Sequence, residues 1–355
     1  MTAVHVVVPD GVDDPGRPSG GNTYDRQLCS GLSSLGWSVH EHAIPGCWPL
    51  PDATSFAALA GVVQRIPDDT LVLLDGLIAS AASEVLVPQA MRLRMVVLVH
   101  MPLGHDPPAD GAEAARVREH AVLASAAAIV TTSAWTRKRL LELYQLPPQR
   151  LHVAQPGVDA AELAIGTAAG GALLCVAAVT FEKGHDVLLD ALARARDLQW
   201  HCVCVGSLER DPAFVEAVRE RSLESGLTDR VEFVGVRTGA DLDRSYAAAD
   251  LVVLVSRAET YGMVVIEGLA RGLPVIATEV GGVSEALGHG ADGIRPGLLV
   301  APEEPTALAA ALRDWLGDAE LRRRLRLLAM QRRESLPRWS TTVSVVAGAL
   351  TRASR

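Results

Sequence analysis

Twelve short apolar runs, separated by amphipathic stretches, constrain the fold of this 355-residue chain more than any other feature. Examples are VHVVVP at residues 4–9 and LVVLVS at 251–256, and helix-like stretches such as DVLLDALARARD at 186–197 lie between such runs. Near-continuous apolar strands that alternate with helices are typical of parallel sheets covered on both faces. The pattern therefore predicts an α/β fold with doubly wound parallel sheets.

The predicted strands fall into two groups of six, because twelve strands are many for one sheet. They span residues 4–9, 38–44, 71–75, 95–100, 128–133 and 151–156, and then 172–179, 200–206, 231–236, 251–256, 274–278 and 297–301. Small residues and glycine dominate the segment DAAELAIGTAAGG at 159–171, which predicts a hinge. We expect one domain at residues 1–165, a second at 166–335, and a C-terminal helix at 336–355 that packs back across the domains.

Composition excludes several classes of function. The net charge of -9 and the pI near 5.6 argue against nucleic-acid binding and give no support to docking on an anionic membrane. Aromatic residues make up only 4% of the chain, too few for a platform on which single-stranded bases stack. The first apolar run is six residues long, which is unlike a signal peptide, and later runs are broken by Asp75, proline or glycine. A cytoplasmic protein is expected.

The five cysteines are expected to be small buried side chains in a reducing compartment. They are Cys29, Cys47, Cys175, Cys202 and Cys204, and the last three lie in predicted strands. The number is odd and no C-x-x-C motif occurs. A metal or redox role for the C-x-C pair is left as a weaker alternative.

Two carboxylates stand out in SRAETYGMVVIEGLARGLPVIAT, residues 256–278. Glu259 lies in the loop after a predicted strand, and a helix is expected to start near Thr260 and to run through Arg271. Its first turn would present free backbone N–H groups to a diphosphate or a sugar hydroxyl. Glu267 would lie more than a turn deeper, so the two acids would contact different parts of one elongated ligand.

The E-x7-E spacing, with the following G-L-P-V-I-A-T, Gly281-Gly282 and Glu285, resembles the family 4 glycosyltransferases, which are retaining GT-B enzymes. The resemblance covers nearly the whole chain. It implies two Rossmann-like domains that face a central cleft, the first binding the acceptor and the second the nucleotide sugar. It also implies that Glu259 contacts hydroxyls of the donor sugar and that Glu267 contacts the ribose. The adjoining donor-binding positions would be Tyr261, Gly262, Met263 and Val264.

The segment TFEKGHDVLLDALA at residues 180–193 resembles the family's phosphate-binding segment. Lys183 would bind the diphosphate and stabilise the leaving group. The family usually carries an arginine five residues before this lysine, and Ala178 stands there instead. Arg257 and Arg237 are candidate replacements.

Other family positions lie in loops that follow predicted strands. Gly20 and Gly21, in RPSGGNTYDRQL, would bring backbone amides against the donor. His100 would contact the donor sugar near the reacting carbon, and His105 and Asp106 would reach the acceptor. In the loop FVGVRTG, Val236 and Arg237 would hold the nucleobase. Gly206, in the VGS that ends another predicted strand, would line the pocket.

No metal site is expected. Asp241 and Asp243 form a D-x-D pattern, but they fall at a predicted helix start, where residues two apart point in different directions and cannot chelate one ion. A metal bound by His105 and Asp106 is a minor alternative. No cofactor is expected either, since the nucleoside-diphosphate sugar is a substrate.

These features predict a retaining, metal-independent glycosyltransferase that moves a hexose-type sugar to a hydroxyl of a soluble small molecule. Glu259, His100 and Lys183 would be the catalytic residues. A nucleotide-sugar epimerase of the same architecture and a non-catalytic nucleotide-sugar binder are the alternatives. The expected partners are donor and acceptor, without nucleic acid or strong membrane association, and a homodimer is left open.

Overall fold

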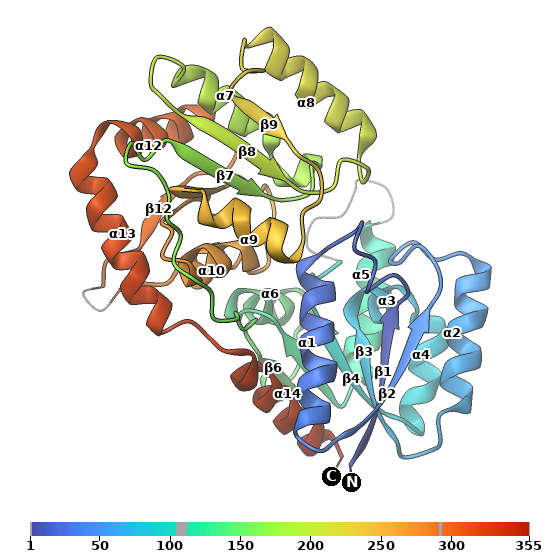
Figure 1. Cartoon of the computed structure of the whole chain (residues 1–355). Coiled ribbons are helices and arrows are strands. Elements are labelled where there is room, and N and C mark those ends of the chain that lie inside the picture. The colour runs from blue at the N-terminus through green and yellow to red at the C-terminus, as the bar shows by residue number, and fades with distance from the viewer. Residues whose placement is uncertain (1, 104–111, 291–292, 355) are drawn as a thin grey trace. The chain divides into compact units, whose positions relative to one another are not determined.

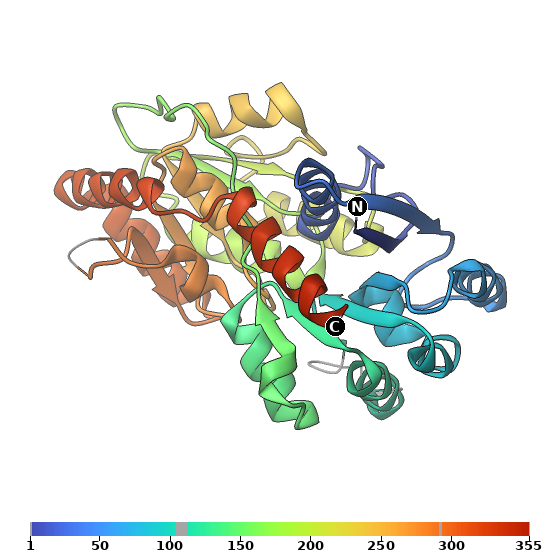
Figure 2. The same cartoon turned by 90° about the horizontal axis from the view of Figure 1, so that it is seen from below.

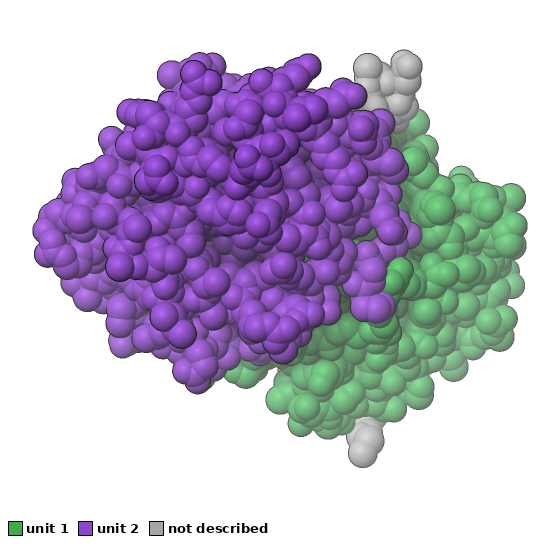
Figure 3. Space-filling view, turned by 45° about the horizontal axis from the view of Figure 1, so that its top comes forward, with its two compact units in different colours: residues 1–14, 19–157, 337–355 green, residues 15–18, 158–336 purple. Residues whose placement is uncertain are grey.

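The computed structural model describes residues 2–103, 112–290 and 293–354. The chain divides into two compact units, which Figures 1 and 3 display. Unit 1 comprises Met1–Asp14, Ser19–Gly157 and Pro337–Arg355, and unit 2 comprises Pro15–Pro18 and Val158–Leu336. Each unit is built on a six-stranded sheet in which every pairing is parallel. The predicted α/β architecture and all twelve predicted strands are thus confirmed.

The sheet of unit 1 has the order β2-β1-β3-β4-β5-β6. Its strands are β1 (Ala3–Pro9), β2 (Ser38–Ile44), β3 (Leu71–Asp75), β4 (Arg94–Val99), β5 (Ala128–Thr131) and β6 (Leu151–Val153). Its helices are α1 (Gly20–Ser34), α2 (Ala53–Arg65), α3 (Gly76–Ala81), α4 (Ser83–Leu86), η1 (Val87–Met91), α5 (Ala112–Ser125), α6 (Ala134–Tyr144), η2 (Pro148–Arg150) and α14 (Trp339–Ala353).

The sheet of unit 2 has the order β12-β11-β10-β7-β8-β9. Its strands are β7 (Ala172–Val176), β8 (His201–Val205), β9 (Val231–Phe233), β10 (Leu251–Leu254), β11 (Val275–Thr278) and β12 (Gly297–Val300). Its helices are η3 (Phe181–Lys183), α7 (His185–Arg194), α8 (Pro212–Glu224), α9 (Gly239–Ala247), α10 (Met263–Ala270), α11 (Val283–Leu287), α12 (Pro305–Gly317) and α13 (Ala319–Glu334).

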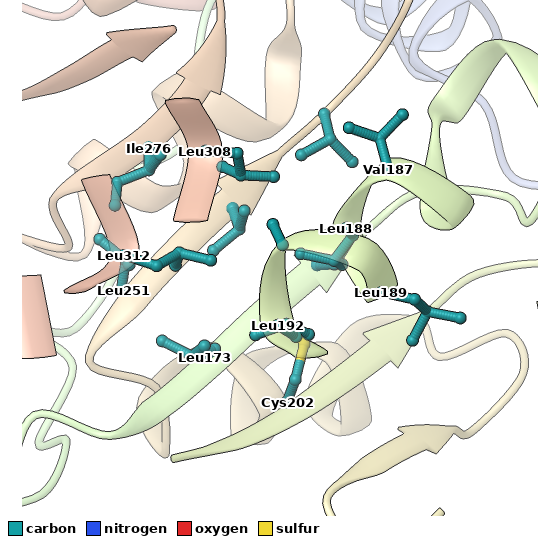
Figure 4. Close-up of a cluster of buried hydrophobic side chains, with 14 of the residues drawn as sticks. Leu173, Val187, Leu188, Leu189, Leu192, Cys202, Leu251, Ile276, Leu308 and Leu312 are labelled. Carbon is teal, nitrogen blue, oxygen red and sulfur yellow. The ribbon is translucent and has the colours of Figure 1, made fainter. Parts of the chain in front are cut away.

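Alternate strand residues of unit 2 pack into two different cores. Leu173 and Leu251 lie in a buried cluster with residues of α7, α8 and α12, part of which is drawn in Figure 4. Their neighbours Leu174 and Val252 lie in a second cluster with α10 and α11. Because successive side chains of a strand point to opposite faces, the sheet is covered by helices on both sides.

The C-terminal helix α14 packs on unit 1. It contacts α1, β4, β5 and β6, and it lies beside α1 in both Figure 1 and Figure 2. The contact with α1 is close, since a methyl group added to Gly31 would lie 2.4 Å from Cγ2 of Val343. The opposite face of the same sheet is covered by α2, α3 and α5 around Val7 and Val97.

The division into units differs from the domain bounds that the sequence predicts. The long segment of unit 2 begins at Val158, whereas the sequence predicts a boundary at 166, and α14, which the sequence predicts to pack across both domains, is grouped with unit 1. The reason is that the predicted hinge is hydrogen-bonded along unit 2. Ala164 N–H donates to the carbonyl of Arg271 (2.9 Å), and Asp250 accepts from the backbone of Thr167 and of Ala172 (2.6 and 2.8 Å).

Candidate active site

The strand order of unit 2 places two predicted site residues at one point of the sheet. Strands β8 and β9 follow on one side of β7, and β10, β11 and β12 follow on the other, so the order reverses between β7 and its neighbour β10. Ligands of open parallel sheets bind outside the carboxyl ends of the strands at such a point. Lys183 follows β7 and Glu259 follows β10. Both residues therefore lie in the loops where a ligand of this sheet is expected.

Lys183 and Glu259 form an ion pair. Lys183 Nζ donates to Oε2 of Glu259 at 2.7 Å, and the two side chains are 30% and 17% exposed. Lys183 is the last residue of η3, and Gly184 follows it as the cap from which α7 begins. Because both side chains are partly exposed, the cation can bind an anionic part of a ligand, and the carboxylate can accept hydrogen bonds from its hydroxyl groups.

The loop that carries Glu259 is held against a glycine turn. The Glu259 carbonyl accepts a hydrogen bond from the N–H of Gly282 (3.2 Å). Gly281 has φ +52°, and a methyl group added there would lie 1.6 Å from the same carbonyl oxygen. Only a glycine tolerates both the conformation and the contact. The Gly281-Gly282 pair thus fixes the backbone of Glu259.

The helix after Glu259 begins later than the sequence predicts. Gly262, with φ +91°, is the N-cap, and α10 runs from Met263 to Ala270, so Thr260 is not a cap. The backbone before Gly262 is taken up by the contact with the glycine turn, which prevents an earlier start. The side chain of Tyr261 is 3% exposed and lies in the core of unit 2, so a donor could meet only its backbone. Met263 and Val264 lie in the first turn of α10, as predicted.

Glu267 lies on α10 and has a different set of partners. Its Oε2 accepts a hydrogen bond from the hydroxyl of buried Tyr246 on α9 (2.7 Å). The guanidinium of Arg271 lies 4.3 Å from the centre of the Tyr246 ring. Burial raises the pKa of Glu267, against the hydrogen bond from Tyr246 and the charge of Arg271, which lower it. The carboxylate is therefore oriented in advance, as binding of a ribose diol requires.

The remaining candidates in unit 2 are partly engaged by the protein. Gly206 N–H donates to the carbonyl of Gly235 (2.9 Å), so this amide is not free for a ligand. Arg237 donates to Ser245 Oγ (2.9 Å), and Val236 is half-buried. Arg257 forms two hydrogen bonds with Asp186 (3.0 and 2.7 Å), so its guanidinium is already neutralised.

In unit 1 the strand order reverses between β1 and β3. Gly20 and Gly21 are the first residues of α1, which follows β1, and His100 follows β4. A methyl group added to Gly21 would lie 3.5 Å from Cδ2 of His100. Three predicted residues thus meet beside the free amides of a helix N-terminus. His105 and Asp106 lie outside the described residues.

His100 is held by two acids. Its Nε2 lies 2.9 Å from Oδ1 of Asp25 on α1 and 3.6 Å from Oδ2 of Asp75 at the end of β3. The ring of Tyr24 meets the imidazole edge-on, with centroids 5.2 Å apart, and the Tyr24 hydroxyl donates to the carbonyl of Ala154 (2.9 Å). These contacts fix the orientation of the ring.

Burial and the neighbouring acids change the protonation of this cluster. Burial first, and then the charge of Asp25, raises the pKa of Asp75 to about 7, while His100 opposes the rise. For His100, burial disfavours the charged ring, but the charge and hydrogen bond of Asp25 and the charge of Asp75 outweigh it and raise its pKa. The ring is more easily protonated than an ordinary histidine.

Two clusters within the described ranges have metal-like spacing. They are Asp25, Asp75 and His100, and Cys175, His185 and Cys204, and in each the ligand atoms lie within 4.8 Å of one another. The second cluster supplies the histidine that the sequence did not place beside the C-x-C pair. Asp241 and Asp243 form ion pairs with two different arginines, Arg244 and Arg271. The absence of a metal requirement stays a prediction.

Comparison with known families identifies both halves of the chain. The family described as "Glycosyltransferase Family 4" matches residues 73–162, and the one described as "Glycosyl transferases group 1" matches residues 170–318. Together the two matches cover more than half of the chain. The chain belongs to the family 4 glycosyltransferases.

Solved structures of low sequence identity share the fold of this family 4 glycosyltransferase. Sucrose-phosphate synthase from Thermosynechococcus elongatus has a TM-score of 0.80 at 22% identity, over 99% of this chain and 98% of that one. An Anabaena protein solved in complex with UDP-glucose has a TM-score of 0.78 at 19% identity, over 99% of this chain and all (100%) of that one. These similarities establish the GT-B fold.

Among curated relatives, the D-inositol 3-phosphate glycosyltransferase of Jonesia denitrificans is 34% identical over 230 residues. The match covers 59% of this chain and 53% of that protein. The chain thus spans about half the length of the curated relatives it matches. Separately, none of the helices in the described ranges has both the length and the apolar character of a membrane span.

Sequence reasoning missed three residues of these sites, namely Asp25, Asp75 and Tyr246. Each had a weak signal. Asp25 lies three residues before Leu28 on the buried side of α1, and Asp75 ends an otherwise apolar strand. An acid at a core-facing position is unusual enough to indicate a partner. Tyr246 stands four residues after Leu242 on α9, in the register of a core residue.

Proposed function

We propose that this family 4 glycosyltransferase moves a hexose-type sugar, with retention of configuration and without a metal, from a nucleoside-diphosphate sugar to a hydroxyl of a small acceptor. The ion pair of Lys183 and Glu259 at the point where the strand order of unit 2 reverses is the observation that carries the proposal. The Anabaena neighbour was solved with UDP-glucose, so UDP-hexoses are the first donors to test. The relatives' name makes D-inositol 3-phosphate the first acceptor to test. The cytoplasm is the expected compartment.

Each side chain would have a defined part in the reaction. Lys183 and the first amides of α10 would bind the diphosphate and stabilise the charge that grows on it. Glu259 and His100 would hold hydroxyls of the sugar, and Glu267, oriented by Tyr246, would hold the ribose. The bond from the anomeric carbon to the phosphate oxygen breaks as the bond to the acceptor oxygen forms on the same face. The departing phosphate oxygen takes the acceptor's proton.

Nucleotide binding tests the first half of the proposal. The sequence contains two lysines, Lys183 and Lys138, and Lys138 lies 3.8 Å from Glu142 in an exposed pair. A thermal-shift panel of nucleoside diphosphates and their sugars should identify one base that stabilises the chain, by about 2.7 kcal/mol at a hundred times its Kd. Lys183→Met should weaken this binding about tenfold or more, and Lys138→Met should not. Equal effects of the two variants would refute the phosphate site.

Turnover tests the second half. Nucleoside diphosphate should be released faster with acceptor than without it, the activity should survive EDTA, and NMR of the product should show the donor's anomeric configuration. Inversion would contradict the retaining mechanism. An epimerised nucleotide sugar formed without acceptor would favour the epimerase, and tight binding without release under every condition would favour the binder.

A further inference from the structure

Unit 1 contains three buried titratable side chains in mutual contact. The side chains of His100, Asp25 and Asp75 are 15%, 6% and 4% exposed. They come from the ends of β3 and β4 and from the second turn of α1. Asp75 also caps α3, since its Oδ1 accepts the N–H of Leu77 at 2.7 Å. Because both acids are almost inaccessible, they would act on a ligand through His100 and not by direct contact.

The charges of this cluster do not balance without an extra proton. Within the described ranges, His100 is the only base that pairs with Asp25 or Asp75. Two ionised carboxylates beside one imidazolium would leave a net buried negative charge, which is costly. The rise in the pKa of Asp75 to about 7, caused by burial and then by Asp25, fits a proton held between the two acids. Such a group titrates as one unit rather than as separate residues.

The acids also decide which nitrogen of His100 is left for a ligand. Nε2 is engaged by Asp25 at 2.9 Å. Nδ1 has no hydrogen-bond partner within residues 2–103, 112–290 and 293–354. Tyr24 packs against the ring without bonding to either nitrogen. A carboxylate on one imidazole nitrogen fixes the tautomer and raises the basicity of the other nitrogen.

We propose that Asp25 and Asp75 are positioning residues that share one proton and hold His100 as an imidazolium, with Nδ1–H as the donor to a ligand oxygen. The ligand is an oxygen-rich sugar, so this inference rests on the proposed function. The hydrogen bond from Nδ1–H to that oxygen is strongest while the cluster retains its proton. It weakens as the pH rises past the raised pKa of His100. Removal of either acidic charge moves this loss to lower pH.

NMR of the histidine imidazoles in the 355-residue chain tests the arrangement without any turnover. In protein labelled with ¹³C and ¹⁵N at histidine, His100→Gln identifies the His100 signals. We expect His100 to titrate above the ordinary histidine range, and Asp25→Asn and Asp75→Asn each to lower its pKa while thermal unfolding stays cooperative. Asp52→Asn is the matched control, because Asp52 caps α2 through Ser55 N–H (2.8 Å) without contacting His100.

The inference would be overturned if His100 had an ordinary histidine pKa that neither Asp25→Asn nor Asp75→Asn changed, whether or not the chain transfers sugars. The inference would also be overturned if Zn²⁺ bound stoichiometrically and the His100 NMR signals showed that it displaces the proton. The kinetic arm then separates positioning from mere structure. At neutral pH, Asp25→Asn should lower kcat roughly 10- to 100-fold, and lowering the pH should recover part of that loss. An unchanged pH profile would refute the positioning role even if the NMR shift occurs.

Discussion

Lys183 and Glu259 form an ion pair, so a bound donor has to replace the partner that each side chain loses. A diphosphate brings more than one negative charge to Lys183 and releases Glu259 to accept hydroxyl groups of the sugar. Both side chains are only partly exposed, so an unpaired Glu259 would be costly. A free phosphate replaces one partner only, whereas a nucleotide sugar replaces both. Under the proposed function, this difference favours the intact donor.

Replacing Glu259 by glutamine tests this exchange of partners. The amide keeps the shape and one oxygen that accepts hydrogen bonds, but it removes the charge. Lys183 is then freer to bind phosphate, and the hydroxyls of the sugar lose the stronger bond to an ionised carboxylate. We expect Glu259→Gln to bind nucleoside diphosphate at least as well as the parent and to lose about 10²–10³-fold in kcat. Calorimetry and initial rates measure the two effects. Glu142→Gln, which breaks the exposed pair with Lys138, should change neither, and a fully active Glu259→Gln would contradict the assignment.

The buried Asp75 predicts a pH dependence of stability. Asp75 holds its proton more tightly in the folded chain, with a pKa of about 7, than at its ordinary value of 3.8. The contribution of protonated Asp75 to the free energy of unfolding is therefore complete below pH 4 and is lost as the pH rises to 7. We expect Asp75→Asn, which keeps the acceptor for Leu77, to be more stable than the parent at pH 8 by roughly 2–4 kcal/mol and to lose this advantage at pH 4. Denaturant unfolding at the two pH values measures it, and a constant difference would refute the buried proton.

At the scale of elements, loops that follow the strands form both sites, and distant segments fix those loops. The Glu259 loop lies on the Gly281-Gly282 turn after β11, and His100 lies against α1 and the end of β3. Such support keeps a binding group within a fraction of an ångström of its working position. Substitutions in the supporting turn should therefore reduce the catalytic rate more than they reduce the stability of the fold.

Gly281→Ala tests the supporting turn. The added methyl would collide with the Glu259 carbonyl and would also occupy a left-handed conformation. We expect a loss of about 1–3 kcal/mol in stability and a fall of about 10²-fold in kcat from the displaced carboxylate. Gly226→Ala is the matched control, since Gly226 has φ +64° but nothing within 4 Å of the new methyl. Equal losses of activity in the two variants would contradict a specific role of the turn.

The sequence predicts the strands because an apolar run is a local property. It does not predict their order, since β7 pairs with β10, and their paired residues lie far apart in the chain. The sequence predicts too early a start for α10 for the same reason, because the contact between Gly281 and Glu259 that prevents this start is not local. Motif spacing and the family resemblance predict Lys183, Glu259 and Glu267 as site residues, whereas Tyr246 and Asp25 look like ordinary helix residues until the fold places them beside Glu267 and His100.

At the scale of the whole molecule, the chain leaves unit 1 at Gly157 and returns to it at Pro337. The returning segment reaches the site of unit 1 through one aromatic contact. Trp339 of α14 packs on Tyr24, with ring centroids 5.6 Å apart, and Tyr24 packs on His100. Unit 1 is thus completed by residues that follow unit 2 in the sequence. A shortened chain that ends at residue 336 would lack the cover of α1 as well as this support of His100.

The sequence also predicts that one donor molecule contacts residues of both units, and hydrogen exchange tests this. Saturating nucleoside diphosphate should protect residues 181–185 and 259–267, by up to about 100-fold at a hundred times its Kd. The matching nucleotide sugar should in addition protect residues 20–25 and 98–102, because only the sugar is expected to reach His100. His100→Gln should keep the first protection and lose the second, and Lys183→Met should weaken both. Protection confined to unit 2 with every nucleotide sugar, or second-site protection that survives His100→Gln, would separate His100 from the donor and assign the cluster of unit 1 to the acceptor.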